Sequence, residues 1–196
     1  MKKTTIILLS ILGFVLLIGF YFMGSYNGLV RLDEQVKQSW SQVEIVYQRR
    51  LDLIPNLVET VKGYAKHEKE TFVSVTEARS RATGAISPDV INDPQKFQAF
   101  QASQSALSSA LSRLLVVVEK YPELKANENF LSLQSQLEGT ENRISVERGR
   151  YNEIAQVFNI QIRQFPTNVI AQMFGFAKKE YFKSEPAATE APKVMF

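Results

Sequence analysis

The pattern of apolar and polar positions divides the 196-residue chain into an apolar start and a periodic remainder. Residues 4–23 contain no charged side chain. Twenty residues in a helix extend about 30 Å, which matches the hydrocarbon core of a bilayer. A cleaved signal peptide is the alternative, but its apolar run is shorter and ends in small residues, whereas bulky residues occupy 20–23 here. The pattern therefore favours an uncleaved transmembrane anchor over residues 1–25.

Three later segments repeat apolar residues with helical spacing. They cover residues 29–64, 97–118 and 130–165, and the mean step in the first and third is about 3.5 residues. This period is typical of coiled-coil-like seams with left-handed supercoiling. Polar Gln104 and the region of Thr140 and Arg148 interrupt the apolar register. No segment alternates with period two, so we expect an all-α fold in which the anchor continues into an antiparallel bundle of three long helices plus a short C-terminal helix.

Local signals set the expected boundaries. Pro55 lies inside the first periodic segment, and we expect a kinked first helix that continues to about residue 83. Asp93 before Pro94 is a predicted N-cap, and Asn127 or Asn129 caps the third long helix. Pro166 ends that helix, Thr167 or Asn168 caps the short final one, and Gly175 follows its end. The bundle thus covers residues 26–183, and residues 184–196 are expected to form a flexible tail.

Composition excludes several kinds of site. The chain has no cysteine and one histidine, so thiolate chemistry, a lipid-modified cysteine and a multi-histidine metal site are absent from this sequence. The formal net charge is +3, but Lys2 and Lys3 precede the apolar run, and the remainder is nearly balanced. A balanced body lacks the basic stripe that nucleic-acid binding needs. His67-Glu68 lacks the second histidine of a zinc-protease motif. We therefore predict no enzyme activity, no cofactor and no nucleic-acid partner.

One polar cluster around the expected kink has two interpretations. It comprises Gln48, Arg49, Arg50, Asp52 and Asn56. In the first interpretation Arg50 and Asp52 neutralise one another or satisfy carbonyls freed at Pro55. In the second, the kink presents the cluster, above all Arg49 and Arg50, as a docking site for a partner.

The extreme C-terminus is a second candidate for partner binding. Val194 and Phe196 would point to the same side of an extended strand, beside a free carboxylate. PDZ-type domains capture such ends by adding a strand to a sheet edge. The alternative is that both residues fold back onto the bundle or bind nothing.

Several motifs resemble the LemA family of bacterial membrane-anchored proteins. They are Tyr26-Asn27, Trp40-Ser41-Gln42-Val43-Glu44, Tyr47-Gln48-Arg49-Arg50, Asp52-Leu53-Ile54-Pro55-Asn56, Tyr121-Pro122-Glu123-Leu124 and Arg150-Tyr151-Asn152. The resemblance covers roughly residues 26–182 and implies an antiparallel helical bundle on an N-terminal anchor, with no established enzymatic activity. It also implies links to envelope stress, to HtpX-type membrane metalloproteases as partners, and to magnetosome formation.

Together these features predict a single-pass protein of the bacterial inner membrane. Residues 4–23 contact lipid, and the positive-inside rule, applied to Lys2 and Lys3, puts the bulk of the chain outside the cytoplasm. We expect an adaptor or scaffold that regulates or assembles with a membrane metalloprotease and forms homo-oligomers. The alternative is a self-assembling structural protein that organises or shapes membrane.

Overall fold

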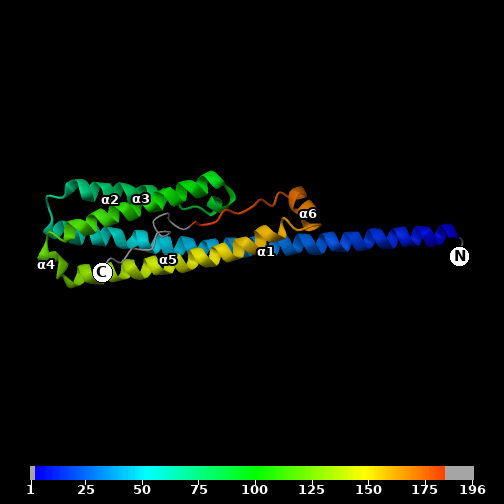
Figure 1. The fold of residues 1–196 in the computed structure, drawn as a ribbon, viewed down its shortest axis with the longest axis horizontal. Helices are drawn as coiled ribbons and strands as arrows, with labels where there is room; N and C mark the ends of the chain where they lie inside the picture. The colour runs from blue at the N-terminus through cyan, green and yellow to red at the C-terminus, as the bar shows by residue number, and fades with distance from the viewer. Residues whose placement is uncertain (1–2, 184–196) are drawn as a thin grey trace, which may run out of the picture.

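The computed structural model describes residues 3–183, in which all regular secondary structure is helical (Figure 1). The helices, in chain order, are α1 (Lys3–Tyr64), α2 (Lys69–Gly84), the short 3-10 helix η1 (Pro88–Asn92), α3 (Pro94–Val118), α4 (Pro122–Lys125), α5 (Glu128–Gln161) and α6 (Thr167–Met173). This arrangement confirms the predicted all-α fold.

Helix α1 is 62 residues long and extends well beyond the rest of the molecule (Figure 1). Its N-terminal part, as far as Phe20, carries exposed apolar side chains. Among the described residues, α1 alone is long and apolar enough to cross a membrane, which indicates membrane association. The helix runs without interruption through residue 25, where we placed the boundary between anchor and bundle, and through Pro55.

The bundle body consists of two helix pairs. Helix α5 packs along α1, and α2 packs along α3, with successive long helices running in opposite directions (Figure 1). Buried apolar side chains from α1, α2 and α3 form a core near the α1–α2 turn, centred on Leu51, Leu107 and Leu114. A second core, nearer the membrane end, is rich in aromatic residues and includes Trp40 and Phe100.

The first helix ends at Tyr64, which corrects the expected end near residue 83. The chain turns at Ala65–Glu68, where Ala65 is buried and the Glu68 N–H donates to the Ala65 carbonyl at 3.1 Å. Helix α2 then returns along the bundle, because its own apolar face packs against α3. The body therefore contains α2 as a separate helix, where the end of α1 was predicted, and the short helices η1 and α4 are additional to the prediction.

The predicted caps of α3 and α5 are confirmed. The Asp93 carboxylate accepts hydrogen bonds from the backbone N–H groups of Gln95 and Lys96, with Pro94 in the first turn. The Asn127 side chain accepts from the Phe130 N–H at 3.0 Å. At α6 the prediction was wrong, because Thr167 is already helical and the preceding Pro166 caps the helix without a side-chain bond. Gly175 follows α6 with φ of 74°, as expected for a residue that ends a helix.

Candidate functional site

An extended segment, residues 176–183, lies along α5 after α6, and we call it the C-terminal strap. Two asparagines of α5 bind its backbone. Asn159 donates to the Lys179 carbonyl and accepts from the Lys179 N–H, both at 2.8 Å. Asn152 makes the same pair of bonds with Phe182, both at 2.9 Å. An asparagine side chain has an NH2 group that donates and a carbonyl oxygen that accepts. Each asparagine can therefore bond both the N–H and the carbonyl of one strap residue, as a residue of a neighbouring β-strand would.

The strap is also fixed by Phe182, whose ring enters the aromatic core. Its centroid lies 5.0 Å from that of Phe97 and 6.1 Å from that of Trp40. The Arg148 guanidinium sits 4.7 Å from the Phe182 ring centroid, a cation–π contact. The Tyr151 hydroxyl donates to the Glu180 carbonyl at 3.1 Å. Burial raises the pKa of Tyr151, so its hydroxyl stays protonated and remains a donor.

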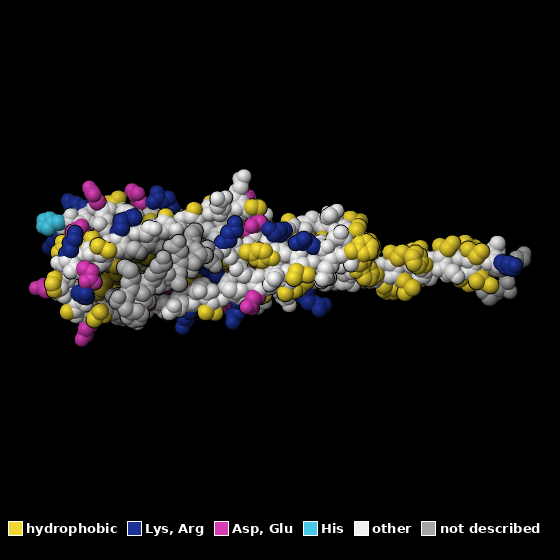
Figure 2. All heavy atoms as spheres, in the orientation of Figure 1, with side chains coloured by type: hydrophobic (Ala, Val, Ile, Leu, Met, Phe, Trp, Pro, Cys, Tyr) yellow, Lys and Arg dark blue, Asp and Glu magenta, His cyan; other side chains and the backbone are white. Residues whose placement is uncertain are grey.

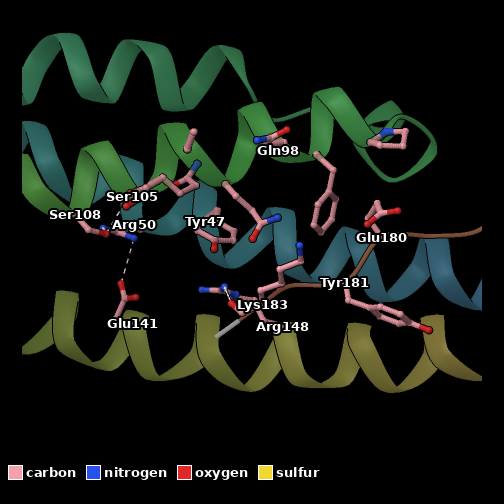
Figure 3. A pocket seen from close by; sticks show the side chains of 15 residues that line it. Tyr47, Arg50, Gln98, Ser105, Ser108, Glu141, Arg148, Glu180, Tyr181 and Lys183 are labelled. Atoms are coloured by element: carbon pink, nitrogen blue, oxygen red, sulfur yellow. Dashed lines mark hydrogen bonds and ion pairs between the residues drawn. The ribbon is translucent and has the colours of Figure 1, made fainter. Parts of the chain in front are cut away.

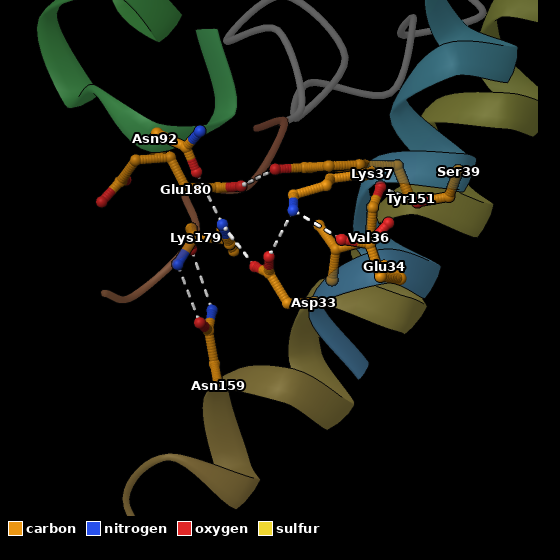
Figure 4. Close-up of polar contacts among 10 residues, drawn as sticks. All are labelled: Asp33, Glu34, Val36, Lys37, Ser39, Asn92, Tyr151, Asn159, Lys179 and Glu180. Atoms are coloured by element: carbon orange, nitrogen blue, oxygen red, sulfur yellow. Dashed lines mark hydrogen bonds and ion pairs between the residues drawn. The ribbon is translucent and has the colours of Figure 1, made fainter. Parts of the chain in front are cut away.

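Lys179 carries a buried charge from the strap into the bundle (Figure 4). Its Nζ lies 2.9 Å from Asp33 Oδ1 and donates to Asn92 Oδ1 at 2.7 Å. Asp33 is also paired with Lys37 at 3.0 Å. Partial burial raises the pKa of Asp33, but hydrogen bonds from Lys179 and Lys37 outweigh it and hold that pKa below its usual range. This network joins the strap to α1 and η1.

A groove of about 610 Å³ opens between α3 and α5, with α1 as its floor (Figure 3). The α3 wall carries amides and hydroxyls, and the strap residues Glu180, Tyr181 and Lys183 line one end. Gln104 also lines the groove and is 5% exposed, and within residues 3–183 neither its Nε2 nor its Oε1 has a hydrogen-bond partner. A buried amide without partners costs about 1–3 kcal/mol, so an unmatched donor and acceptor lie buried in the wall of the groove.

Arg50 fixes the inner end of this groove. It is 5% exposed, and its guanidinium donates to Ser108 Oγ at 2.6 Å and pairs with Glu141 Oε2 at 3.2 Å. The guanidinium thus connects α1, α3 and α5. The interpretation in which Arg50 and Asp52 neutralise one another is wrong, because Asp52 is exposed and accepts from Gln48 Nε2 at 2.8 Å.

The carbonyl freed by Pro55 is satisfied by a different arginine. Proline has no N–H, so the Leu51 carbonyl, four residues earlier, lacks its helical donor. Arg79 Nε, from α2, donates to this oxygen at 2.9 Å. The proline therefore creates an attachment point for α2 on α1. The assignment of this role to Arg50 is corrected, since Arg79 performs it.

The remaining predicted partner-binding residues differ in accessibility. Arg49, Asp52 and Asn56 are exposed on α1, whereas Arg50 is buried among three helices. Val194 and Phe196 lie outside the described residues.

Sequence reasoning did not predict that Asn152 and Asn159 bind the strap. It also did not predict the buried charge of Lys179. The available signal was the seven-residue spacing of two asparagines between buried apolar residues of α5, which puts both on one face. Gln104 was visible as a polar interruption of the α3 seam, and the structure buries it as that register implies.

The side chains that line the groove are mainly hydrogen-bonding and charged groups. In the part of the chain that the structure describes, no three histidine, cysteine or carboxylate side chains are grouped to hold a metal ion. The groove instead offers amides, hydroxyls and the Arg50 guanidinium.

A family model for the LemA family matches residues 39–196. The chain belongs to the LemA family. The matched region contains every groove and strap residue described above. The predicted family membership is thus confirmed.

Curated relatives of this LemA-family chain fall into two groups by name. Magnetosome protein MamQ 2 and magnetosome protein MamQ 1 of Paramagnetospirillum magneticum are each 28% identical over 200 residues, covering 93% of this chain and 73% of theirs. Protein LemA of Metamycoplasma hominis is 30% identical over 165 residues, covering 83% of this chain and 72% of its own.

Proposed function

We propose that this LemA-family protein is a membrane-anchored, non-enzymatic scaffold that holds an extended segment of a partner protein in the groove between α3 and α5. The observation that supports the proposal is the buried amide of the groove residue Gln104, both of whose polar atoms are unpaired among the described residues. Burying an amide without partners is unfavourable, and a peptide backbone offers the N–H and carbonyl that would satisfy it.

The molecule already contains this type of recognition. Asn152 and Asn159 each bind one residue of extended backbone through a donor and an acceptor. Gln104 carries the same chemical group on the opposite wall of the groove, and the neighbouring Ser105 adds a hydroxyl. An extended segment in the groove would lie between the strap and α3.

We further propose the location of the protein in the membrane and the protein that it binds. The apolar run is the single span in the bacterial inner membrane, with the bulk of the chain outside the cytoplasm. Resemblance to the LemA family suggests a membrane metalloprotease of the HtpX type as the partner. A second contact with this partner would be made by the exposed α1 side chains Arg49, Asp52 and Asn56. A third would be made by Val194 and Phe196.

Crosslinking in native membranes tests the scaffold. A photoreactive residue at exposed Ser105, which lines the groove, is expected to capture a membrane protein that mass spectrometry identifies. The matched control is Ser80, an exposed serine on α2 away from the groove, which is expected to capture nothing comparable. Products at Ser105 confined to residues 184–196 of the same chain would assign the groove to its own C-terminus and contradict the proposal.

The substitution Gln104→Leu separates binding from folding. Leucine removes the unpaired amide, so we expect the free energy of unfolding to rise by about 1 kcal/mol. Capture at Ser105 is expected to fall in the same variant. Unchanged capture would show that Gln104 does not anchor the segment.

A second candidate function, self-assembly into a structure that organises membrane, rests on exposed apolar side chains around the body. Ile45, Val73, Val116 and Val146 lie on four different helices, and each is more than half exposed. Large uniform particles in mild detergent would support it, and a monomer at all concentrations would contradict it.

A further inference from the structure

Helix α6 packs against α1 at the place where α1 leaves the body. Ile170 and Ala171 of α6 form a small buried cluster with Leu29 of α1, and Phe22 packs against it. The rings of Tyr26 and Phe174 are 4.6 Å apart. These contacts bring α6 to residues 22–29, at the end of the apolar run.

The outer surface of this region is apolar and exposed. Figure 2 shows hydrophobic side chains gathered where the slender part of α1 meets the body. The exposed apolar residues here are Val157 at 54%, Ile160 at 48%, Phe165 at 84%, Val169 at 44%, Met173 at 67% and Phe174 at 55%.

The charge of this region differs from that of the rest of the body. Residues 156–177 contain a single charged side chain, Arg163, and no carboxylate, and the exposed Lys178 follows directly, whereas Lys179 is buried in the body. Apolar residues with basic residues at their edge are typical of segments that lie at a membrane surface, where cations meet lipid phosphates.

The depth of α6 relative to the apolar run fits such a surface. Tyr21, near the end of the apolar run, and Thr167, the first residue of α6, line the same small hollow. If residues 4–23 fill the hydrocarbon core, α6 lies level with the edge of that core. An interfacial segment buries its apolar face about 5–10 Å into the boundary between headgroups and acyl chains, which is the level that α6 reaches.

We propose that residues 165–176, centred on α6, form an interfacial collar that inserts its exposed apolar side chains into the lipid surface beside the span. The occupant is the bilayer, because the surface is continuous with the apolar run of α1 and carries no acidic group. The collar gives the body a second membrane contact and fixes the face that it turns toward the lipid. This inference rests on the membrane anchoring in the proposed function and not on the groove.

Environment-sensitive probes on single cysteines test the collar, since the chain has no native cysteine. We would label full-length Phe165→Cys and Met173→Cys variants with a nitrobenzoxadiazole probe and reconstitute them in phosphatidylcholine–phosphatidylglycerol vesicles. Both probes are expected to emit at shorter wavelength than in detergent-free buffer, and to be quenched by nitroxide lipids labelled near the headgroup. Val116→Cys is the matched control, because Val116 is 64% exposed on α3 in the body, and its probe is expected to show neither effect.

A probe at Leu17, within the apolar run, separates failure of the collar from failure of the anchor. Quenching at Leu17 with none at 165 and 173 would overturn the collar and leave the anchor standing. Absence of quenching at Leu17 would overturn the anchor and the collar together. A short-wavelength emission at 165 and 173 without lipid quenching would mean that protein covers the surface, which also overturns the collar.

Discussion

Three amide side chains with the same chemistry have different roles in the body. Asn152 and Asn159 each donate to and accept from the backbone of the C-terminal strap, while the Gln104 amide is buried with no partner among residues 3–183. The first two therefore contribute to folding, because removing either would leave buried backbone groups unpaired. The third costs stability in the isolated chain, and this is why we propose the groove as a binding site.

Lys179 is the residue that should make the strap sensitive to acid. Its partner Asp33 has a folded-state pKa below the unfolded one, so ionised Asp33 stabilises the fold above that unfolded value of about 3.8. This contribution is lost as the pH falls through the lower, folded-state pKa. In Lys179→Met we expect the free energy of unfolding at pH 7 to fall by about 1–3 kcal/mol. Between pH 5 and pH 3 we expect the free energy of unfolding of this variant to decrease less steeply than that of the unsubstituted protein. Urea unfolding at a series of pH values measures both.

The adjacent Lys178 provides the control. It is exposed, its ion pair with Glu180 is 3.5 Å long, and its Nζ lies 6.0 Å from the Tyr181 ring centroid, so Lys178→Met is expected to change stability by less than about 0.5 kcal/mol. An equal effect of the two substitutions would contradict a specific role for the buried Lys179–Asp33 pair.

At the scale of elements, the attachment of α2 to α1 depends on a proline and an arginine far apart in sequence. Arg79 satisfies the Leu51 carbonyl that Pro55 leaves free. Arg79→Leu should therefore cost about 1–2 kcal/mol in the native background. In the Pro55→Ala background the new N–H at residue 55 can bond the same carbonyl, so the cost should be smaller by about 1 kcal/mol.

A double-mutant cycle of these substitutions, measured by chemical denaturation, gives the coupling. Arg81→Leu is the matched control, since Arg81 is exposed on the same helix and should show no coupling to residue 55. Additive effects of Arg79→Leu and Pro55→Ala would mean that the hydrogen bond does not carry the attachment.

The sequence predicted well those helices whose apolar residues repeat continuously along the chain. The seams of α1, α3 and α5 repeat over many turns, and the caps at Asp93 and Asn127 are local in sequence. The turn at Ala65–Glu68 was missed because apolar periodicity continues on both sides and no proline marks the reversal. The strap was missed for another reason, because its bonding partners are asparagine side chains about 20–30 residues away.

At the scale of the whole molecule, the open question is which side of the membrane holds the body. Ser80 is exposed on α2, and Ser80→Cys would introduce the sole thiol of the chain. In intact spheroplasts we expect a membrane-impermeant maleimide to label it, because two lysines precede the span and should stay in the cytoplasm. Labelling only after lysis would place the body in the cytoplasm, and Leu17→Cys, within the span, should remain unlabelled in both conditions.

The unbroken helix α1 also makes the body a lever arm. From residue 24 to Tyr64 it extends about 60 Å beyond the apolar run without a break in the helix. A span that tilts by about 20°, as spans do when the bilayer is thinner than they are, would swing the α1–α2 turn sideways by about 20 Å. Bilayer thickness would thereby set how far the groove stands from other proteins in the same membrane, and a collar lying on the lipid would oppose that swing.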